Sequence, residues 1–309
     1  MGYDLAYLRP KKHFHTISPH IEPELRIKSG ETVTVETLDN VGNRVNSVND
    51  KDKIRPPLNP LSGPIFVENA EKGDVLEVVI EDVKILRGFG WTGQTSDWGF
   101  IEVGSPVWNL FTEAVPTLIK ICRITDNKIY FPLIGERDLV LPVRPLVGTI
   151  GTAPEAEVPS NTPGPHGGNM DCQEVRPKNR LYLPVFVPGG LLFLGDVHAL
   201  QGHGELGGAP IEVSTETELT INLIKNWKIS WPRIESDEYL VTVGSSRPLD
   251  NAIRIALTEM ISWLKQDYDL DTWDANLLLT SIAEIECSQI TNPLHTAALK
   301  CPKRYLPKS

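Results

Sequence analysis

Residues 31–38, ETVTVETL, alternate polar and apolar side chains, and residues 74–81, DVLEVVIE, nearly repeat this pattern. Alternation with a period of two is typical of a β-strand that has one buried face. Each stretch follows a turn in which a glycine, Gly30 or Gly73, supplies the positive φ that a tight connection needs. These two stretches predict that the first part of the chain is rich in β-structure.

Proline and glycine divide the chain up to about residue 240 into short segments. The 25 prolines argue against long helices before residue 245. Residues 181–187 and 191–198 read as further strands. Residues 148–168 are dense in Gly, Pro, Ser, Thr and Asn, so they form either a flexible linker or a long functional loop. We favour the loop, because histidine and carboxylate side chains follow it directly.

The C-terminal part changes to a helical period. Apolar side chains recur there at intervals of three and four residues and predict a helix that begins just after Pro248. They are Leu249, Ala252, Ile253, Ala256, Leu257, Met260, Ile261 and Leu264. A second helix is expected at 271–283, with Asp271 or Thr272 as N-cap. Its inward side chains are expected to be Leu277, Leu278 and Ile282. A strand is expected at 285–290.

These elements predict an α+β fold that is predominantly β, with sandwich-like or barrel-like sheets. A C-terminal helix pair and a closing strand complete it. We expect residues 1–240 to form a mainly β region that carries the functional site. Residues 241–309 form an α+β portion packed against it, within one compact unit.

Composition and charge exclude several classes of protein. The 309 residues include 40 acidic and 30 basic side chains, a formal charge of -10, which argues against a nucleic-acid partner. Apolar runs are too short for a transmembrane helix, and residues 1–10 lack the apolar core of a signal peptide, so we expect a cytoplasmic protein without a membrane partner. The four cysteines form no C-x-x-C pair, which excludes a zinc knuckle and a thioredoxin-type site.

Common catalytic signatures are also absent from the sequence. It contains no G-x-S-x-G, no G-x-x-x-x-G-K-[ST], no H-E-x-x-H and no G-x-G-x-x-G after a strand. Any chemistry must therefore be built from other residues.

Histidine placement gives the clearest indication of a site. Three histidines lie near the N-terminus, at positions 13, 15 and 20, and three more lie at 166, 198 and 203. On a strand over 191–198, Asp196 and His198 project from the same face and form half of a divalent metal site. Catalytic zinc takes about three protein ligands and an open position, and Asp171 is the nearest further acid. Glycines around the group let a small ligand approach the backbone.

Other interpretations of these residues stay open. An Asp that merely orients a histidine would give the same spacing, and histidines near a terminus are more often exposed, so only His15 is kept as a further ligand candidate. Cys172 is either a nucleophile assisted by Glu174 and Lys178 or, as we favour, a small buried residue.

Three tryptophans lie near glycine-rich stretches. Trp91, Trp98 and Trp108 either wall a pocket or pack in the core. Aromatic core packing and a pocket lining explain their spacing equally well.

Several motifs occur in a recognisable order along nearly the whole chain. They are Gly63–Glu68 with Ala70–Asp74, Gly148–Pro154, Gly167–Asp171, Gly195–Ala199 with Gln201–Glu205, Ile211–Glu212, Trp231–Arg233 and Ala256–Met260. On these motifs the chain resembles the acetamidase/formamidase family. The resemblance implies hydrolysis of a short carboxamide, such as formamide or acetamide, to ammonia and a carboxylate. It also implies a mostly β fold with a smaller α+β portion, homo-oligomeric assembly and metal-dependent chemistry at the Asp and His motif.

This resemblance suggests roles for the candidate ligands. Asp171, Asp196 and His198, with His15 as an additional candidate, hold a divalent ion, with zinc as the first choice and calcium or magnesium as alternatives. The family looks unrelated to the amidases with a Ser-Ser-Lys triad and to the cysteine-based nitrilases, in agreement with the missing motifs.

Four further residues are candidates for the catalytic steps. Glu205 or Glu212 would act as general base and then as acid to the leaving ammonia, and Gln201 or backbone N–H groups would stabilise the oxyanion. The family usually reads Gln-Gly-Asp-Gly-Glu, whereas this chain has His203 in place of the central Asp. His203 could serve as a ligand or as a base.

Two other functions stay open, and the His203 replacement motivates the first. One is a metal hydrolase that acts on a different C–N bond or on an ester. The other is a non-catalytic β protein that binds a small ligand or a metal.

Overall fold

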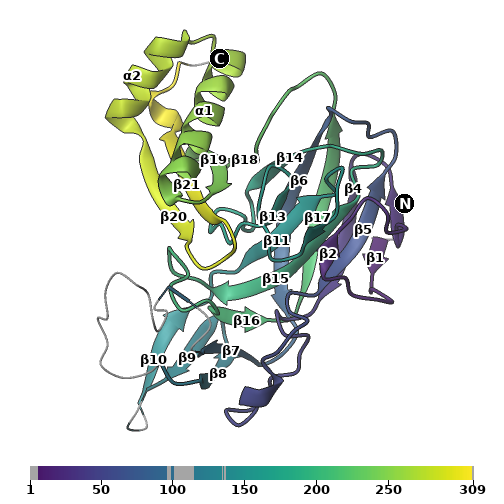
Figure 1. The fold of residues 1–309 in the computed structure, drawn as a ribbon, viewed down its shortest axis with the longest axis vertical. Coiled ribbons are helices and arrows are strands. Elements are labelled where there is room, and N and C mark those ends of the chain that lie inside the picture. Colours follow the sequence, from purple (N-terminus) through teal and green to yellow (C-terminus); the bar gives the residue numbers. More distant parts are fainter. Residues whose placement is uncertain (1–5, 96–98, 101–114, 134, 136, 308–309) are drawn as a thin grey trace.

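The computed structural model describes residues 6–95, 99–100, 115–133, 135 and 137–307. Within these residues, two large β-sheets form the body of the protein, and two helices lie at one end of it (Figure 1). This arrangement confirms the predicted α+β class with a predominance of β-structure.

The first sheet has nine strands among the described residues. Their order across the sheet is β1 (Ala6–Leu8), β4 (Glu31–Thr37), β17 (Thr215–Ile224), β6 (Val75–Ile85), β14 (Arg180–Pro184), β18 (Arg233–Glu235), β19 (Tyr239–Ser246), β21 (His295–Pro302) and β20 (Glu284–Gln289). The two strands expected from alternation, β4 and β6, both pair with β17. Val33 and Val35 are fully buried, as the period of two predicts.

The second sheet has ten strands among the described residues and carries the histidine-rich motifs. Its main order is β10 (Asp138–Pro142), β9 (Lys128–Pro132), β8 (Leu118–Thr125), β7 (Phe89–Gln94), β16 (Ile211–Val213), β15 (Leu192–Leu200), β11 (Leu146–Thr152) and β13 (Gly167–Asn169). Strand β5 (Leu61–Val67) pairs with β15 and with β3 (Leu25–Ile27), which completes the ten. Strand β15 is therefore central in this sheet. Strands β2 (Thr16–Ile17) and β12 (Val158–Pro159) form a separate two-stranded sheet.

The main hydrophobic core joins the two sheets. Buried side chains of β4, β6 and β17 in the first sheet pack in one cluster with those of β5, β11 and β15 in the second. Burial of this apolar surface is the main stabilising term of the fold. This packing holds β15 in place against the first sheet.

The interpretation of 148–168 as one long loop is wrong at both ends, because residues 167–168 belong to β13 and the first residues belong to β11. Residues 148–152 belong to β11, whose seven residues are all buried between β15 and β13. A strand covered on both faces shows no alternation, and its small residues serve close packing. The same reason explains why β21, which is buried at nearly every position, gave no signal in the sequence.

The helices confirm the change of period at the C-terminus. Helix α1 (Leu249–Tyr268) begins directly after Pro248, and α2 (Thr272–Ile282) begins after Asp271, whose side chain accepts a hydrogen bond from the Trp273 backbone N–H at 2.8 Å. Short 3₁₀ turns cover Lys51–Lys53 and Lys303–Tyr305. No helix formed by the described residues is both long enough and apolar enough to cross a membrane.

One predicted inward side chain of α2 is wrong. Leu277 is 65% exposed, whereas Ala275 and Leu279 are buried. Leu278 and Ile282 pack against the second core, which also contains Met260, as expected. The run of three leucines at 277–279 covers about 200° of the helix surface, so all three cannot face one neighbour.

Candidate active site

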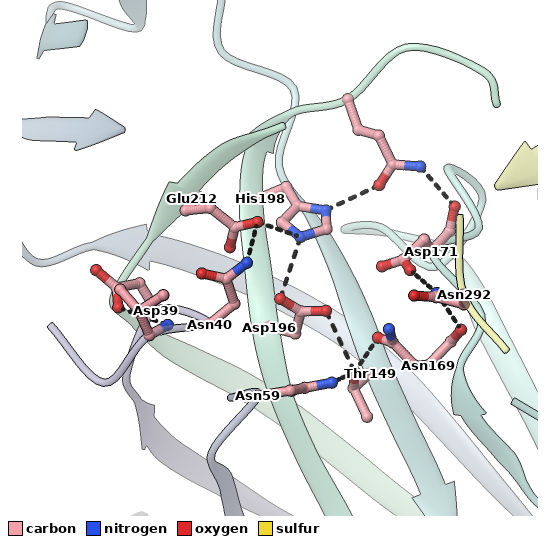
Figure 2. Close-up of polar contacts among 12 residues, drawn as sticks. Asp39, Asn40, Asn59, Thr149, Asn169, Asp171, Asp196, His198, Glu212 and Asn292 are labelled. Atoms are coloured by element: carbon pink, nitrogen blue, oxygen red, sulfur yellow. Dashed lines mark hydrogen bonds and ion pairs between the residues drawn. The ribbon is translucent and has the colours of Figure 1, made fainter. Parts of the chain in front are cut away.

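The end of β15 brings an aspartate, a histidine and a glutamate together. Asp196 and His198 lie two residues apart on this strand, and His198 lies directly opposite Glu212 of β16 in the antiparallel register. Directly opposed side chains on one face of a sheet are neighbours. His198 Nε2 accordingly lies 3.3 Å from Asp196 Oδ1 and 3.4 Å from Glu212 Oε1 (Figure 2). The predicted shared face of Asp196 and His198 is confirmed.

Two more carboxylates reach this point from loops. The backbone N–H of Asp171, just after β13, donates to the Gly148 carbonyl at 3.1 Å. Glu205 lies in the loop that follows β15, and the Asp171 carboxylate lies close enough to raise the pKa of Glu205. Both residues are at most 8% exposed. Four carboxylates therefore surround one imidazole in the interior.

Three of these acids have a left-handed backbone. The φ angles are 45° for Asp171, 55° for Asp196 and 46° for Glu205. A residue other than glycine in this region is uncommon and costs roughly 1 kcal/mol or more. Such strain persists only where surrounding contacts enforce it, and it gathers at functional sites.

Gln201 fixes the orientation of the His198 ring. Its amide nitrogen donates to the backbone carbonyls of Asp171 and Ser288 at 2.7 and 3.1 Å. Its Oε1 atom therefore faces His198 Nδ1, at 2.8 Å, and accepts the Nδ1–H bond. In the neutral ring this leaves the Nε2 lone pair directed at the carboxylates, which is the arrangement in which histidine binds a metal.

The cluster contains more acidic than basic groups, and this shifts the pKa values of its members. Burial and the Asp196 carboxylate raise the pKa of Asp171 to about 6, and burial raises the pKa of Glu212 to about 8. Burial and the Asp171 carboxylate raise the pKa of Glu205 well above its usual range. Burial lowers the pKa of His198, but Glu212 and Asp196 outweigh it and raise this pKa well above its usual value. The cluster thus has a strong affinity for positive charge.

The residues present fit a bound cation. Ligand atoms of Asp171, Asp196 and His198 all lie within 4.8 Å of one another, the one such group of histidine, cysteine and acidic side chains that the described residues form. Asp171 Oδ1 is buried without a hydrogen-bond partner. One nitrogen and two carboxylate groups are a donor set that suits zinc. A divalent ion at this point would balance the buried negative charge.

Gly148 keeps the space beside the cluster open. A Cβ atom at this position would lie 3.0 Å from His198 Cε1 and 2.5 Å from the Asp196 carbonyl oxygen, and closer still to Asp171 Oδ1. Any side chain here would displace the three candidate ligands. This explains the glycine inside a buried strand.

Uncharged polar side chains surround the cluster and were not identified from the sequence. Asn292, between β20 and β21, donates to Asp171 Oδ2 at 2.6 Å, and Thr149 donates to Asp196 Oδ2 at 3.4 Å. Asn40 donates to Glu212 Oε1 at 2.9 Å (Figure 2). These residues come from three distant parts of the chain, and only Thr149 lies within a motif that the sequence pointed out.

A cavity of about 200 Å³ lies beside the cluster. Asp196 and Glu205 line it together with asparagine side chains and Thr291. A second cavity of about 400 Å³, lined by Lys120, Phe131 and His203, also reaches Glu205. The smaller cavity has room for a compound of a few non-hydrogen atoms.

Two predicted site residues lie outside the cluster. The side chain of His203 is 53% exposed, and its Nδ1 atom lies 3.7 Å from Glu286 Oε2. The next residue, Gly204, donates its backbone N–H to the Cys287 carbonyl at 2.7 Å, which holds this part of the loop against β20. His15 Nδ1 lies 2.6 Å from the Leu58 carbonyl oxygen. Leu58 lines the smaller cavity, whereas His15 is not among the residues that line it.

The remaining candidates are Cys172 and the three tryptophans, and those that the structure describes are buried. Cys172 is 1% exposed, and burial raises the pKa of its thiol to about 12, which fits the favoured interpretation as a small buried residue. Trp91 is fully buried and donates to Asp39 at 3.2 Å, so it packs in the core. Trp98 and Trp108 lie outside the described residues.

Comparisons with known proteins agree with the motif order. A sequence model of the Acetamidase/Formamidase family matches residues 9–164 and 160–302. The formamidase of Methylophilus methylotrophus is 28% identical over 256 residues, which are 65% of this chain and 61% of that protein. The chain spans between 61% and 66% of the length of the curated relatives that it matches.

Solved structures superpose over nearly the whole chain. An acetamidase from Yersinia enterocolitica is 35% identical with a TM-score of 0.90, covering 96% of this chain and 91% of that chain. A predicted acetamidase/formamidase from Thermoanaerobacter tengcongensis is 35% identical with a TM-score of 0.88, covering 97% and 96%.

Proposed function

The chain belongs to the acetamidase/formamidase family, and on this basis we propose that it hydrolyses short linear carboxamides to ammonia and a carboxylate. One observation carries the proposal. Asp171, Asp196 and His198 converge within 4.8 Å beside a cavity of about 200 Å³. A buried acidic cluster next to a small cavity is the expected form of a metal-assisted hydrolytic site.

Asp171, Asp196 and His198 are the proposed ligands of a divalent ion. Zinc is the first candidate because histidine and carboxylate ligands suit it, and calcium or magnesium are alternatives because they prefer oxygen ligands. When bound, such an ion supplies Lewis acidity, which polarises a carbonyl group and lowers the pKa of water.

Glu205 is the proposed proton-transfer group. It lines the smaller cavity, and its Oε2 atom is buried without a partner. It would accept a proton from the water whose oxygen attacks the amide carbon. It would then donate this proton to the nitrogen as the C–N bond breaks, so that ammonia leaves instead of an amide anion. Glu212 already accepts from Asn40 and faces His198, so we propose that it positions these two residues.

Gln201 is proposed as a positioning residue. Both of its amide N–H contacts go to backbone carbonyls, and its Oε1 atom accepts from His198. Oxyanion stabilisation therefore falls to the ion or to backbone N–H groups. His203 lies at the larger cavity, away from the proposed ligands, so its presence leaves their set unchanged.

Release of ammonia from purified protein tests the proposed reaction. We expect turnover of formamide, acetamide or propionamide, with carboxylate formed in equal amount. An ester such as ethyl acetate serves as the competing substrate. Hydrolysis of the ester without release of ammonia from any amide would favour the alternative hydrolase. Retained binding of amides without any turnover would favour a non-catalytic binding protein.

Assembly and location are further proposals. Among the described residues, β10 is the last strand of its sheet, and its Leu139 and Val140 are 48% and 56% exposed. An exposed apolar strand at a sheet edge favours association, which supports a homo-oligomer. Light scattering coupled to size-exclusion chromatography measures the mass of the assembly, which we expect to be a multiple of the mass of one chain. The cytoplasmic location stays a prediction from the sequence.

A further inference from the structure

Two asparagines from separate loops lie next to each other at the smaller cavity. Asn40 follows β4 and Asn59 precedes β5, and the backbone N–H of Asn59 donates to the Asn40 carbonyl at 2.6 Å. Both side chains line the cavity that also contains Asp196 and Glu205. Asn59 is 4% exposed and has a φ of 52°. The pair is therefore built into the wall of the proposed active site.

The hydrogen bonds of each side chain fix which end of its amide is free. Asn40 Nδ2 donates to Glu212 Oε1 at 2.9 Å. Asn59 Nδ2 donates to Thr149 Oγ1 at 2.9 Å and to the Ser160 carbonyl at 3.2 Å. The Ser160 carbonyl only accepts, so reversal of the Asn59 amide would place two acceptors together, and an ionised Glu212 holds the nitrogen end of Asn40 in the same way. The free ends are the two Oδ1 atoms.

Both Oδ1 atoms are buried and have no hydrogen-bond partner. A buried acceptor without a partner costs roughly 1–3 kcal/mol, so we expect these two atoms to accept from water in the free protein and from a ligand in the complex. The ligand that fits must offer two N–H or O–H groups within a cavity of about 200 Å³. The –NH₂ group of a primary carboxamide offers two such donors on one planar nitrogen.

We propose that Asn40 Oδ1 and Asn59 Oδ1 accept the two N–H bonds of the substrate's carboxamide nitrogen. The pair determines specificity for primary amides over N-substituted amides. This inference rests on the proposed amidase function. An N-methyl amide has one donor, so it leaves one Oδ1 atom unpaired and places a methyl group against it. A site that hydrogen-bonds a polar group of its substrate strongly rejects an analogue that lacks this group. An apolar pocket discriminates much less between substrates that differ by one methylene group.

The same contacts would position the reacting bond. With its nitrogen held by the asparagines, the substrate directs its carbonyl group toward the cluster of Asp171, Asp196 and His198. Glu205 lines the same cavity, as its proposed role in protonating this nitrogen requires. The –NH₂ end and the C=O end of an amide are similar in size. Because the two asparagine oxygens only accept hydrogen bonds, they bind the –NH₂ end and not the C=O end.

The test compares kcat/KM for acetamide and N-methylacetamide, with ammonia and methylamine quantified as products. We expect the wild-type protein to prefer acetamide by at least about 10²-fold. Asn59→Ala should lower kcat/KM for acetamide about 10-fold to 100-fold and change that for N-methylacetamide little, so the preference collapses. Asn40→Ala should act in the same direction and serves as the second variant if Asn59→Ala does not fold.

Asn179→Ala is the matched structural control. Asn179 is 6% exposed, and its Nδ2 atom donates to the Glu174 carbonyl at 2.9 Å, outside the cavity. Its replacement should lower the unfolding temperature without changing the preference between the two amides. An equal loss on both amides in Asn59→Ala and Asn40→Ala would overturn the inference. A wild-type protein without any amide turnover would instead contradict the proposed function itself.

Discussion

Buried charges are arranged differently at the end of β15 and between β18 and α1. In the latter region, Arg233 Nε donates to Glu259 Oε1 at 2.7 Å, with the two side chains 0% and 4% exposed. The Arg233 guanidinium also lies 4.9 and 5.1 Å from the ring centres of Trp227 and Trp263. One cation therefore meets one carboxylate inside an aromatic layer.

At the end of β15, four carboxylates face a single imidazole. Asp171, Glu205 and Glu212 each keep one buried oxygen without a partner. Arg233 Nη2 is also buried without a partner, so the two regions differ in the balance of charge: one carboxylate neutralises one guanidinium in the first, whereas four carboxylates meet one imidazole in the second. The difference is what we expect if the Arg233 pair stabilises the fold and the cluster at β15 binds the proposed ion.

The largest expected effect of this difference is on turnover. Glu205→Gln keeps the size of the side chain and removes proton transfer, so we expect kcat for acetamide to fall about 10³-fold. The unfolding temperature and the ion content should stay unchanged. Glu218→Gln, a partly exposed glutamate of β17, is the control. Retained turnover in Glu205→Gln would move the acid and base role to Glu212.

The same acid-to-amide change should destabilise the other region. Glu259→Gln leaves the Arg233 charge buried without a counter-charge, so we expect the free energy of unfolding to fall by about 4 kcal/mol. Urea denaturation measures this change, and kcat per folded molecule should stay unchanged. Glu155→Gln breaks an ion pair with Lys72 whose side chains are 64% and 67% exposed, and should have little effect. A similar response of both variants would remove the distinction between the regions.

A smaller effect of opposite sign is expected for Asp171→Asn in metal-free protein. Burial and Asp196 raise the pKa of Asp171 to about 6, above the value near 4 in the unfolded chain. Its ionised form therefore destabilises the fold above pH 6, and this cost disappears as the pH falls to 4. We expect Asp171→Asn to raise the free energy of unfolding by about 1–2 kcal/mol at pH 7 and by less at pH 4. A loss of stability at pH 7 would contradict this explanation.

Sequence patterns located the centre of the site but not its surroundings. Asp196 and His198 could be predicted as neighbours because the period of a strand is local, and the register of β15 and β16 then adds Glu212. Asn40 and Glu212 are 172 residues apart, and Asn292 reaches Asp171 across 121 residues. Such contacts depend on loop paths that leave no periodic signal.

The secondary structure was likewise predictable only where a local sequence pattern exists. Strands with one exposed face, such as β4, were visible from their alternation, and α1 from its apolar stripe. Strands buried on both faces, such as β11 and β21, contain small residues and lack a period. The position of His203 was not predictable, because it is set by contact of its loop with β20.

The most direct test of the account is the dependence of amide hydrolysis on a bound ion. Ion content and ammonia release from acetamide would be measured in purified protein, after chelation, and after addition of Zn²⁺, Mg²⁺ or Ca²⁺, with Asp196→Asn in parallel. We expect one ion per chain, loss of activity on chelation, restoration by one of these ions, and neither ion nor activity in Asp196→Asn. Full activity in ion-free wild-type protein would contradict the account.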